Sequence, residues 1–250
     1  GRIPDPFYGQ NEGACAWVQD REWWYRLRFV APPEPPQADE RLLLVFHGLD
    51  TFATVYLNGK ELGATDNMFR AFTFDVTAAL RPGVENTLAV RFDPHLEHVK
   101  DKDTRTRRLD NHEPRVAMRK AQFGYGWDWG PVLPTFGIWR PVELLRQRRA
   151  AIAGVHAYTL KLDDEPDQAL VGVTVEVDAF AANEPLTAEI TLTPPNRTGG
   201  AAMARGKVTF APGQTTATAY LVVKNPQLWW TNGLGDQPLY RLAVTLAQNG

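Results

Sequence analysis

The protein has 250 residues, of which 44% are hydrophobic and 22% charged, so it is long enough for one large or two ordinary globular domains. Its net charge of −2 gives no overall attraction to nucleic acid or anionic lipid, and no apolar run approaches the roughly 20 residues of a membrane span. Cys15 is the single cysteine, which excludes an internal disulfide and a cysteine-based zinc site.

The first half of the chain has the period-two pattern of antiparallel strands. Residues 25–30 (YRLRFV) and 87–92 (TLAVRF) alternate apolar and polar side chains, which predicts two half-buried strands. The apolar faces would be formed by Tyr25, Leu27 and Phe29, and by Leu88, Val90 and Phe92. Between them, Asn58-Gly59 predicts a two-residue hairpin turn, because both residues tolerate positive φ angles. With its long connections, this half is predicted to be a sandwich of the jelly-roll type.

A long segment, residues 94–122, fits no strand and contains at most a short helix around EPRVAMRK (113–120). Its basic residues are interleaved with aspartates, which indicates a solvated loop and not a nucleic-acid patch. They are Lys100, Asp101, Lys102, Asp103, Arg105, Arg107, Arg108 and Asp110. His95, His98 and His112 lack the spacing of a metal site, so neither a metal nor a cofactor is expected.

The pattern changes near residue 150. After LRQRRAAIAG, about six short alternating strands separated by turn residues fill about 100 residues, which is the density of an immunoglobulin-like sandwich. The clearest segments are HAYTLKL, VGVTVEVDAF, TAEITLT, KVTF and YRLAVTLA. We therefore predict an all-β protein with a jelly-roll domain over residues 1–149 and an immunoglobulin-like domain over residues 150–250.

The stretch QFGYGWDWGPV (122–132) places one aspartate between two tryptophans. An indole face suits stacking on a sugar ring, and an ionised carboxylate accepts hydrogen bonds from adjacent hydroxyls, so Trp127, Asp128 and Trp129 form a candidate sugar-binding tip. The alternative is structural: both indoles belong to the core, and Asp128 accepts backbone N–H groups in a turn.

Six motifs resemble, in order, the non-catalytic N-terminal half of glycoside hydrolase family two, and most closely its β-mannosidase branch. They are DPFYGQNE (5–12), EWWYRLRF (22–29), FHGLDTFATVYLNGKELG (46–63), RKAQFGYGWDWGP (119–131), GIWRPVEL (137–144) and WWTNGLGDQPLY (229–240). The resemblance implies a galactose-binding-like jelly roll, then an immunoglobulin-like domain, then a (β/α)8 barrel that carries both catalytic glutamates. It also implies that Trp127, Asp128 and Trp129 reach the barrel's active site and help to hold the terminal mannose.

Retaining glycoside hydrolysis needs two carboxyl groups about 5 to 5.5 Å apart, and Asp128 stands alone in its motif. We therefore expect no catalytic residue in this chain, which resembles a piece excised from a longer exo-β-mannosidase, with strands before Gly1 and the barrel after Gly250. Its expected partners are a terminal β-mannosyl saccharide and that barrel, with no nucleic acid and no membrane.

Three alternatives stay open: a free-standing carbohydrate-binding module, the accessory part of another family two β-glycosidase, and a purely structural pair of sandwiches. The opening residues lack the features of a secretory signal, and the compartment of the parent, cytoplasmic or periplasmic, is left open. Trp229 and Trp230 are expected to pack on the sandwich or on the barrel without contacting sugar.

Overall fold

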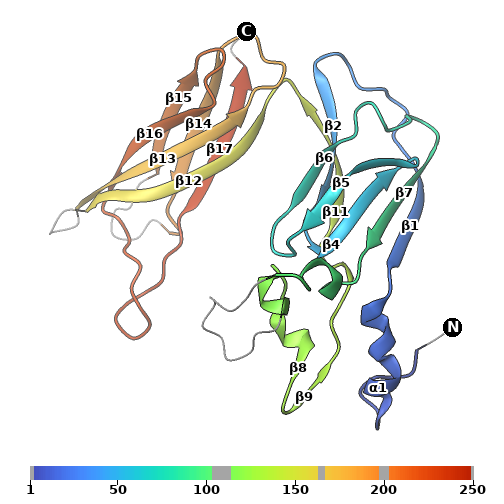
Figure 1. Ribbon diagram of the computed structural model, residues 1–250. Helices are drawn as coiled ribbons and strands as arrows, with labels where there is room; N and C mark the ends of the chain where they lie inside the picture. The colour runs from blue at the N-terminus through green and yellow to red at the C-terminus, as the bar shows by residue number, and fades with distance from the viewer. Residues whose placement is uncertain (1–2, 103–113, 163–166, 197–202, 249–250) are drawn as a thin grey trace. The chain divides into compact units, whose positions relative to one another are not determined.

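The computed structural model describes residues 3–102, 114–162, 167–196 and 203–248 of the protein (Figure 1). The chain divides into two compact units, Gly1–Arg146 and Gln147–Gly250. Both are built from antiparallel sheets, so the all-β prediction is confirmed. Among the described residues, no helix is long and apolar enough to cross a membrane.

The first unit is a sandwich of two main sheets. One has the strand order β1 (Trp23–Val30), β7 (Glu85–Phe92), β4 (Phe52–Leu57) and β5 (Lys60–Asp66). The other has the order β11 (Val142–Arg148), β2 (Glu40–Phe46) and β6 (Phe72–Asp75), and a short pair joins β10 (Gly137–Ile138) to β3 (Leu49–Asp50).

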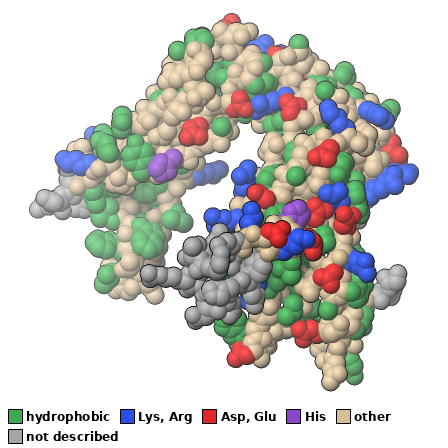
Figure 2. Space-filling view, in the orientation of Figure 1, with side chains coloured by type: hydrophobic (Ala, Val, Ile, Leu, Met, Phe, Trp, Pro, Cys, Tyr) green, Lys and Arg blue, Asp and Glu red, His purple; other side chains and the backbone are tan. Residues whose placement is uncertain are grey.

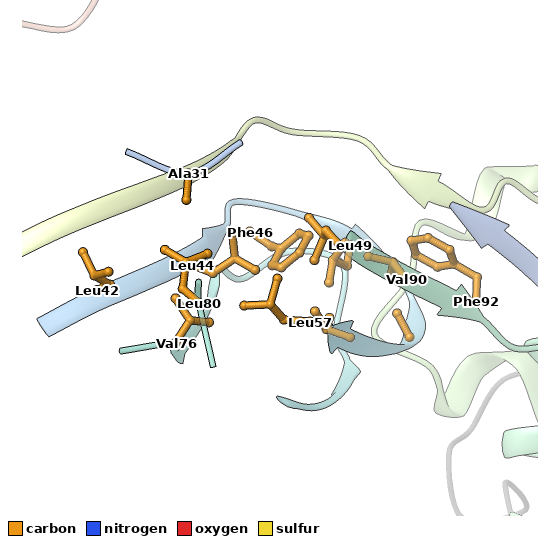
Figure 3. Packing of buried hydrophobic residues seen from close by; sticks show 13 residues of the cluster. Ala31, Leu42, Leu44, Phe46, Leu49, Leu57, Val76, Leu80, Val90 and Phe92 are labelled. Atoms are coloured by element: carbon orange, nitrogen blue, oxygen red, sulfur yellow. The ribbon is translucent and has the colours of Figure 1, made fainter. Parts of the chain in front are cut away.

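The core of the first unit lies between these sheets, where Phe46 from β2 and Leu57 from β4 are almost completely buried (Figure 3). The predicted apolar face of β7 is confirmed, because Leu88, Val90 and Phe92 are all buried in this cluster.

The prediction that β1 is half-buried was wrong for two of its three apolar residues. Phe29 packs on the core, but Tyr25 and Leu27 are exposed. Both line an open slot of about 390 Å³, whose other wall includes Leu144 of β11. In the described sheets, β1 pairs only with β7 and β11 only with β2, so no neighbouring strand covers this side of the sandwich.

The predicted hairpin turn is confirmed. Asn58 and Gly59 have φ angles of 53° and 84°, and they join β4 to β5. The Asn58 amide also donates to the backbone oxygen of Ala79 at 2.9 Å, which ties the turn to the next segment.

The sequence patterns did not predict the helices near the N-terminus, α1 (Asn11–Cys15) and the 3-10 helix Ala16–Asp20. Other single turns of 3-10 helix occur at Leu96–His98, Pro114–Ala117 and Gln122–Gly124. The second of these lies within the predicted short helix. Five residues of the predicted charged loop lie outside the described part of the chain, namely Asp103, Arg105, Arg107, Arg108 and Asp110. His112 and Glu113, the first residue of the predicted short helix, also lie outside it.

In its described residues the second unit has two three-stranded antiparallel sheets, which is the layered arrangement expected of an immunoglobulin-like sandwich. Their strand orders are β12 (Ala151–Leu162), β13 (Gln168–Asp178), β16 (Thr216–Lys224), and β15 (Ala204–Phe210), β14 (Leu186–Thr193), β17 (Arg241–Gln248). The centre is filled by residues such as Val173, Ile190 and Phe210. Trp229 and Trp230 lie in the loop before β17 with 57% and 49% of their surface exposed, so they are not core residues of this unit.

Candidate functional site: an exposed tryptophan hairpin

The stretch around Trp127 forms a small two-stranded hairpin. β8 (Tyr125–Trp127) pairs with β9 (Gly130–Val132), and Asp128 and Trp129 make the loop between them. Figure 1 shows this hairpin at the same end of the first unit as α1. The two segments touch, because the Val132 N–H donates to Glu12 Oε1 at 2.7 Å.

The backbone conformation at position 126 in β8 requires a glycine. Its φ of 85° lies in the left-handed region, and a Cβ atom there would lie 2.8 Å from Cγ2 of Val132. Any other side chain at this position would strain the backbone and push β9 away. The glycine therefore allows the two short strands to pair and brings Trp127 to the loop.

Both tryptophans of the hairpin face solvent. Trp127 is 72% exposed and Trp129 is 85% exposed, so the alternative that both indoles belong to the core is wrong. Asp128 is also exposed, and no described side chain or backbone N–H donates a hydrogen bond to its carboxylate. The structure thus brings the three predicted residues together at one tip, with both indoles and the carboxylate exposed to solvent.

Two recesses border this tip. One, of about 820 Å³, is mainly apolar and is lined by Phe7, Phe123, Trp127, Trp129 and Leu133 among others. The second, of about 640 Å³, is more polar and includes Asp128 together with Glu12. An apolar wall beside a polar one is the arrangement with which proteins bind sugars and other amphipathic ligands.

A buried ion pair lies at the base of the hairpin. Lys120 Nζ donates to Asp50 Oδ1 at 2.5 Å and Oδ2 at 2.6 Å, and also to the backbone oxygen of Thr135 at 2.7 Å. The Thr135 hydroxyl donates to Asp50 Oδ2 at 2.6 Å. Burial lowers the pKa of Lys120, and the Asp50 carboxylate opposes that change.

A buried histidine contacts the first strand of the hairpin. The His95 ring stacks on Phe136 with centroids 3.9 Å apart, and its Nδ1 lies 3.2 Å from the hydroxyl of Tyr125. Burial, and next the positive charge of Lys120, lower the pKa of His95 to about 4. The ring is therefore neutral at pH 7, and burial also raises the pKa of the Tyr125 hydroxyl.

We expect the stability of the chain to fall as the pH drops from about 6.5 to 4, partly because of His95. The folded pKa of about 4 lies below the ordinary 6.5, so in this interval the unfolded chain binds a proton that the folded chain does not. The loss attributable to His95 is about 3 kcal/mol, which urea unfolding measured across this pH interval would detect.

The variant His95→Phe isolates this contribution, because it keeps a ring on Phe136 but cannot titrate. Its stability should depend less steeply on pH than that of the wild type. Equal slopes in wild type and His95→Phe would show that His95 does not titrate in this way.

The remaining histidine and charge predictions concern sites other than the hairpin. His98 stacks on Phe52 with centroids 4.2 Å apart, and its Nε2 lies 3.3 Å from Asp93 Oδ2. Within residues 3–102, 114–162, 167–196 and 203–248, no three His, Cys, Asp or Glu side chains are placed to hold a metal ion. Figure 2 shows basic and acidic side chains interspersed on the visible face of the first unit.

Sequence reasoning missed the residues that support the tip: Glu12, Asp50, His95, Lys120 and Thr135. Asp50 lies in HGLDTF, where a single acidic residue adjoins apolar neighbours, whereas Lys120 lies in RKAQFG directly after another basic residue, Arg119. The context of Asp50 is a signal of burial with a partner, but nothing in the sequence identifies Lys120 as that partner.

Two family models match consecutive parts of the chain. The model described as "Glycosyl hydrolase 2 galactose-binding domain-like" matches residues 1–140, and the model "Glycosyl hydrolases family 2" matches residues 150–250. The chain belongs to glycosyl hydrolase family 2, and its two sandwiches are the galactose-binding-like and immunoglobulin-like domains of that family.

Within the family, the chain is similar to proteins named for β-mannosidase activity. It is 36% identical over 251 residues to beta-mannosidase B of Emericella nidulans, covering 98% of this chain and 29% of that protein. The beta-mannosidase B of Thermothelomyces thermophilus is likewise 36% identical, with 98% and 28% covered. The chain thus spans less than a third of the length of these relatives.

Solved structures agree with the family assignment. The crystal structure of a beta-D-mannosidase from Dictyoglomus thermophilum superposes with a TM-score of 0.83 and 33% identity, over 98% of this chain and 30% of that one. An exo-chitosanase from Amycolatopsis orientalis has a TM-score of 0.66 at 22% identity, covering 100% of this chain and 26% of that chain, which shows a shared fold alone.

Proposed function

We propose that this chain is the non-catalytic part of a retaining exo-β-mannosidase that removes terminal β-D-mannose. In this proposal residues 1–149 and 150–250 are its two domains, and the hairpin tip completes the sugar site of a (β/α)8 catalytic barrel in the same protein. The exposed constellation of Trp127, Asp128 and Trp129 carries the proposal, and the similarity to proteins named β-mannosidase supports the choice of mannose.

The chemistry of the tip suits a sugar at the end of a glycan. An indole can stack on the C–H face of a pyranose, while a carboxylate can accept hydrogen bonds from two neighbouring hydroxyls. The tip is solvated in this chain, so it gains its full effect when a second surface encloses the sugar and excludes water. This is why we assign recognition to the hairpin and bond cleavage to the barrel.

We predict that the chain alone does not hydrolyse an aryl β-mannoside. Retaining hydrolysis needs an acid and a nucleophile, and the proposal places both in the barrel. In the polar recess of this chain, Glu12 accepts the Val132 N–H and is assigned to supporting the hairpin, while Asp128 is assigned to binding the sugar. The assay compares the purified chain with a mock-purified blank. Turnover clearly above the blank would contradict the division of labour proposed here.

The exposed tip also favours a second candidate, a free-standing carbohydrate-binding module. We predict that the chain binds mannose very weakly, because half of a pocket leaves most of the sugar in water. Titration calorimetry distinguishes the two candidates, with Trp129→Ala as a variant that removes one stacking surface. Low-micromolar affinity that Trp129→Ala abolishes would favour the module.

A third candidate, the accessory part of another family 2 β-glycosidase, differs only in the sugar. The test is a panel of aryl β-glycosides given to a full-length protein that contains this chain. The proposal expects the highest kcat/KM on the β-mannoside, and a clear preference for a β-galactoside or β-glucuronide would replace mannose by that sugar.

A further inference from the structure

The excursion that carries the hairpin begins and ends at one buried carboxylate. Lys120 immediately precedes the excursion and Thr135 immediately follows it, and the side chains of both bind Asp50. Lys120 also donates to the backbone oxygen of Thr135 at 2.7 Å, so the two ends are joined to each other as well. Residues 121–134 therefore leave and rejoin the sandwich at the same point.

Asp50 is itself fixed in the sandwich. It lies on β3, which pairs with β10 so that Asp50 faces Gly137, only two residues after Thr135. The Thr51 hydroxyl donates to its Oδ1 at 2.5 Å. Side-chain and backbone contacts thus hold this carboxylate from several directions, and it can act as a fixed point for both ends of the excursion.

Stability alone does not explain an ion pair at this place. Asp50 is 3% exposed and Lys120 is 4% exposed, so both groups lose most of their hydration. In buried sites, apolar residues of similar size are often equally or more stabilising, and what the charged pair adds is directional geometry. Lys120 has three N–H donors, and here they are directed at the Asp50 carboxylate and at the Thr135 oxygen.

Two further contacts hold the strands of the hairpin but leave the tip untouched. The Tyr125 hydroxyl lies 3.2 Å from His95 Nδ1, and the Val132 N–H donates to Glu12. Within the excursion, the Leu133 N–H donates to the Gly124 oxygen at 2.8 Å. The described contacts therefore fix the base and both strands, while Trp127, Asp128 and Trp129 stay free to meet a ligand.

We propose that Asp50, Lys120 and Thr135 are positioning residues for the hairpin: their buried network sets the place and direction from which the tip meets the sugar. Its effect on catalysis rests on the function proposed above, whereas its effect on the hairpin itself does not. Recognition sites need such support, because a displacement of about 1 Å at the contacting groups already weakens a site.

Amide hydrogen exchange of this chain tests the network directly. The variant Asp50→Asn/Lys120→Met removes both charges together, so neither is left buried alone. We expect the protected amides of the hairpin, such as those of Val132 and Leu133, to exchange at least about tenfold faster than in the wild type, with those of β7 unchanged. The matched control Glu40→Gln/Arg146→Met removes the ion pair between β2 and β11, away from the hairpin, and should leave hairpin exchange as in the wild type.

Two outcomes would overturn the proposal: unchanged exchange in the hairpin, or an equal acceleration in hairpin and β7, which would indicate only general destabilisation. If the double variant does not fold, Thr135→Val provides the test, because it keeps the shape but loses the hydroxyl bonded to Asp50. In Thr135→Val the amides of the hairpin should exchange severalfold faster than in the wild type, and in Thr135→Ser they should exchange at the wild-type rate. If the amides exchange in Thr135→Val at the wild-type rate, the proposal is also overturned.

A kinetic experiment separates this inference from the proposed function. In a full-length protein with its catalytic domain, Asp50→Asn/Lys120→Met should raise KM for an aryl β-mannoside about tenfold, and Thr135→Val should raise it less. If Asp128→Ala leaves kcat/KM unchanged while the exchange result holds, the network positions the hairpin but the mannose-binding role is wrong. If Asp128→Ala lowers kcat/KM and neither network variant changes exchange or KM, the positioning role is wrong.

Discussion

Replacing Lys120 by alanine should lower the free energy of unfolding of this chain by about 3 to 5 kcal/mol, because it leaves the buried Asp50 carboxylate without its cation. The Thr135 hydroxyl and Thr51 hydroxyl would still donate to Asp50, but neither brings a compensating charge. Urea unfolding followed by tryptophan fluorescence measures the loss.

Two control variants define this expectation. Asp50→Asn/Lys120→Met should be considerably more stable than Lys120→Ala, since no unpaired charge is buried in it. Lys100→Ala breaks the exposed contact with Glu97 and should change stability little, because water solvates both groups. If Lys120→Ala and Lys100→Ala have the same unfolding midpoint, the buried pair does not have the energetic role assigned to it.

Local chemistry explains which parts of the fold the sequence predicted. The Asn58-Gly59 turn depends on the φ angles of two residues, and the alternation of Leu88, Val90 and Phe92 depends on one strand that is covered on one side. The same alternation in β1 was misleading. Whether Tyr25 and Leu27 are buried depends on which strand lies beside them, and that is a property of the sheet order and not of residues 25–30.

The candidate site divides in the same way. Tryptophans, an aspartate and glycines in QFGYGWDWGPV predicted an exposed recognition tip without any tertiary information. The exposed indoles contradict the alternative that both belong to the core, and sugar binding by the tip stays a prediction. The support of the tip was not predictable, since Asp50 and Lys120 are 70 residues apart in the sequence. Their pairing is a consequence of topology, because β3 and β10 become neighbours only when the sandwich closes.

In a full-length protein with its catalytic domain, Asp128→Ala should lower kcat/KM on an aryl β-mannoside by about one to two powers of ten for each hydrogen bond lost. Bonds to an ionised carboxylate contribute about 1.5 to 3 kcal/mol each, and about 1.4 kcal/mol corresponds to a factor of ten. Part of the loss should be in kcat, because hydroxyl contacts help to distort the sugar toward its oxocarbenium-like transition state.

Asp128→Asn tests the role of the charge most sharply, since it keeps the shape and one acceptor oxygen. The matched control is Asp75→Asn, because Asp75 is an exposed aspartate of the same unit whose carboxylate accepts the Thr77 N–H at 2.9 Å in a turn. A purely structural aspartate of this kind should, when replaced, lower the melting temperature slightly and leave the kinetics of the folded enzyme unchanged. If Asp128→Asn behaves like Asp75→Asn and retains full kcat/KM, Asp128 does not bind the sugar.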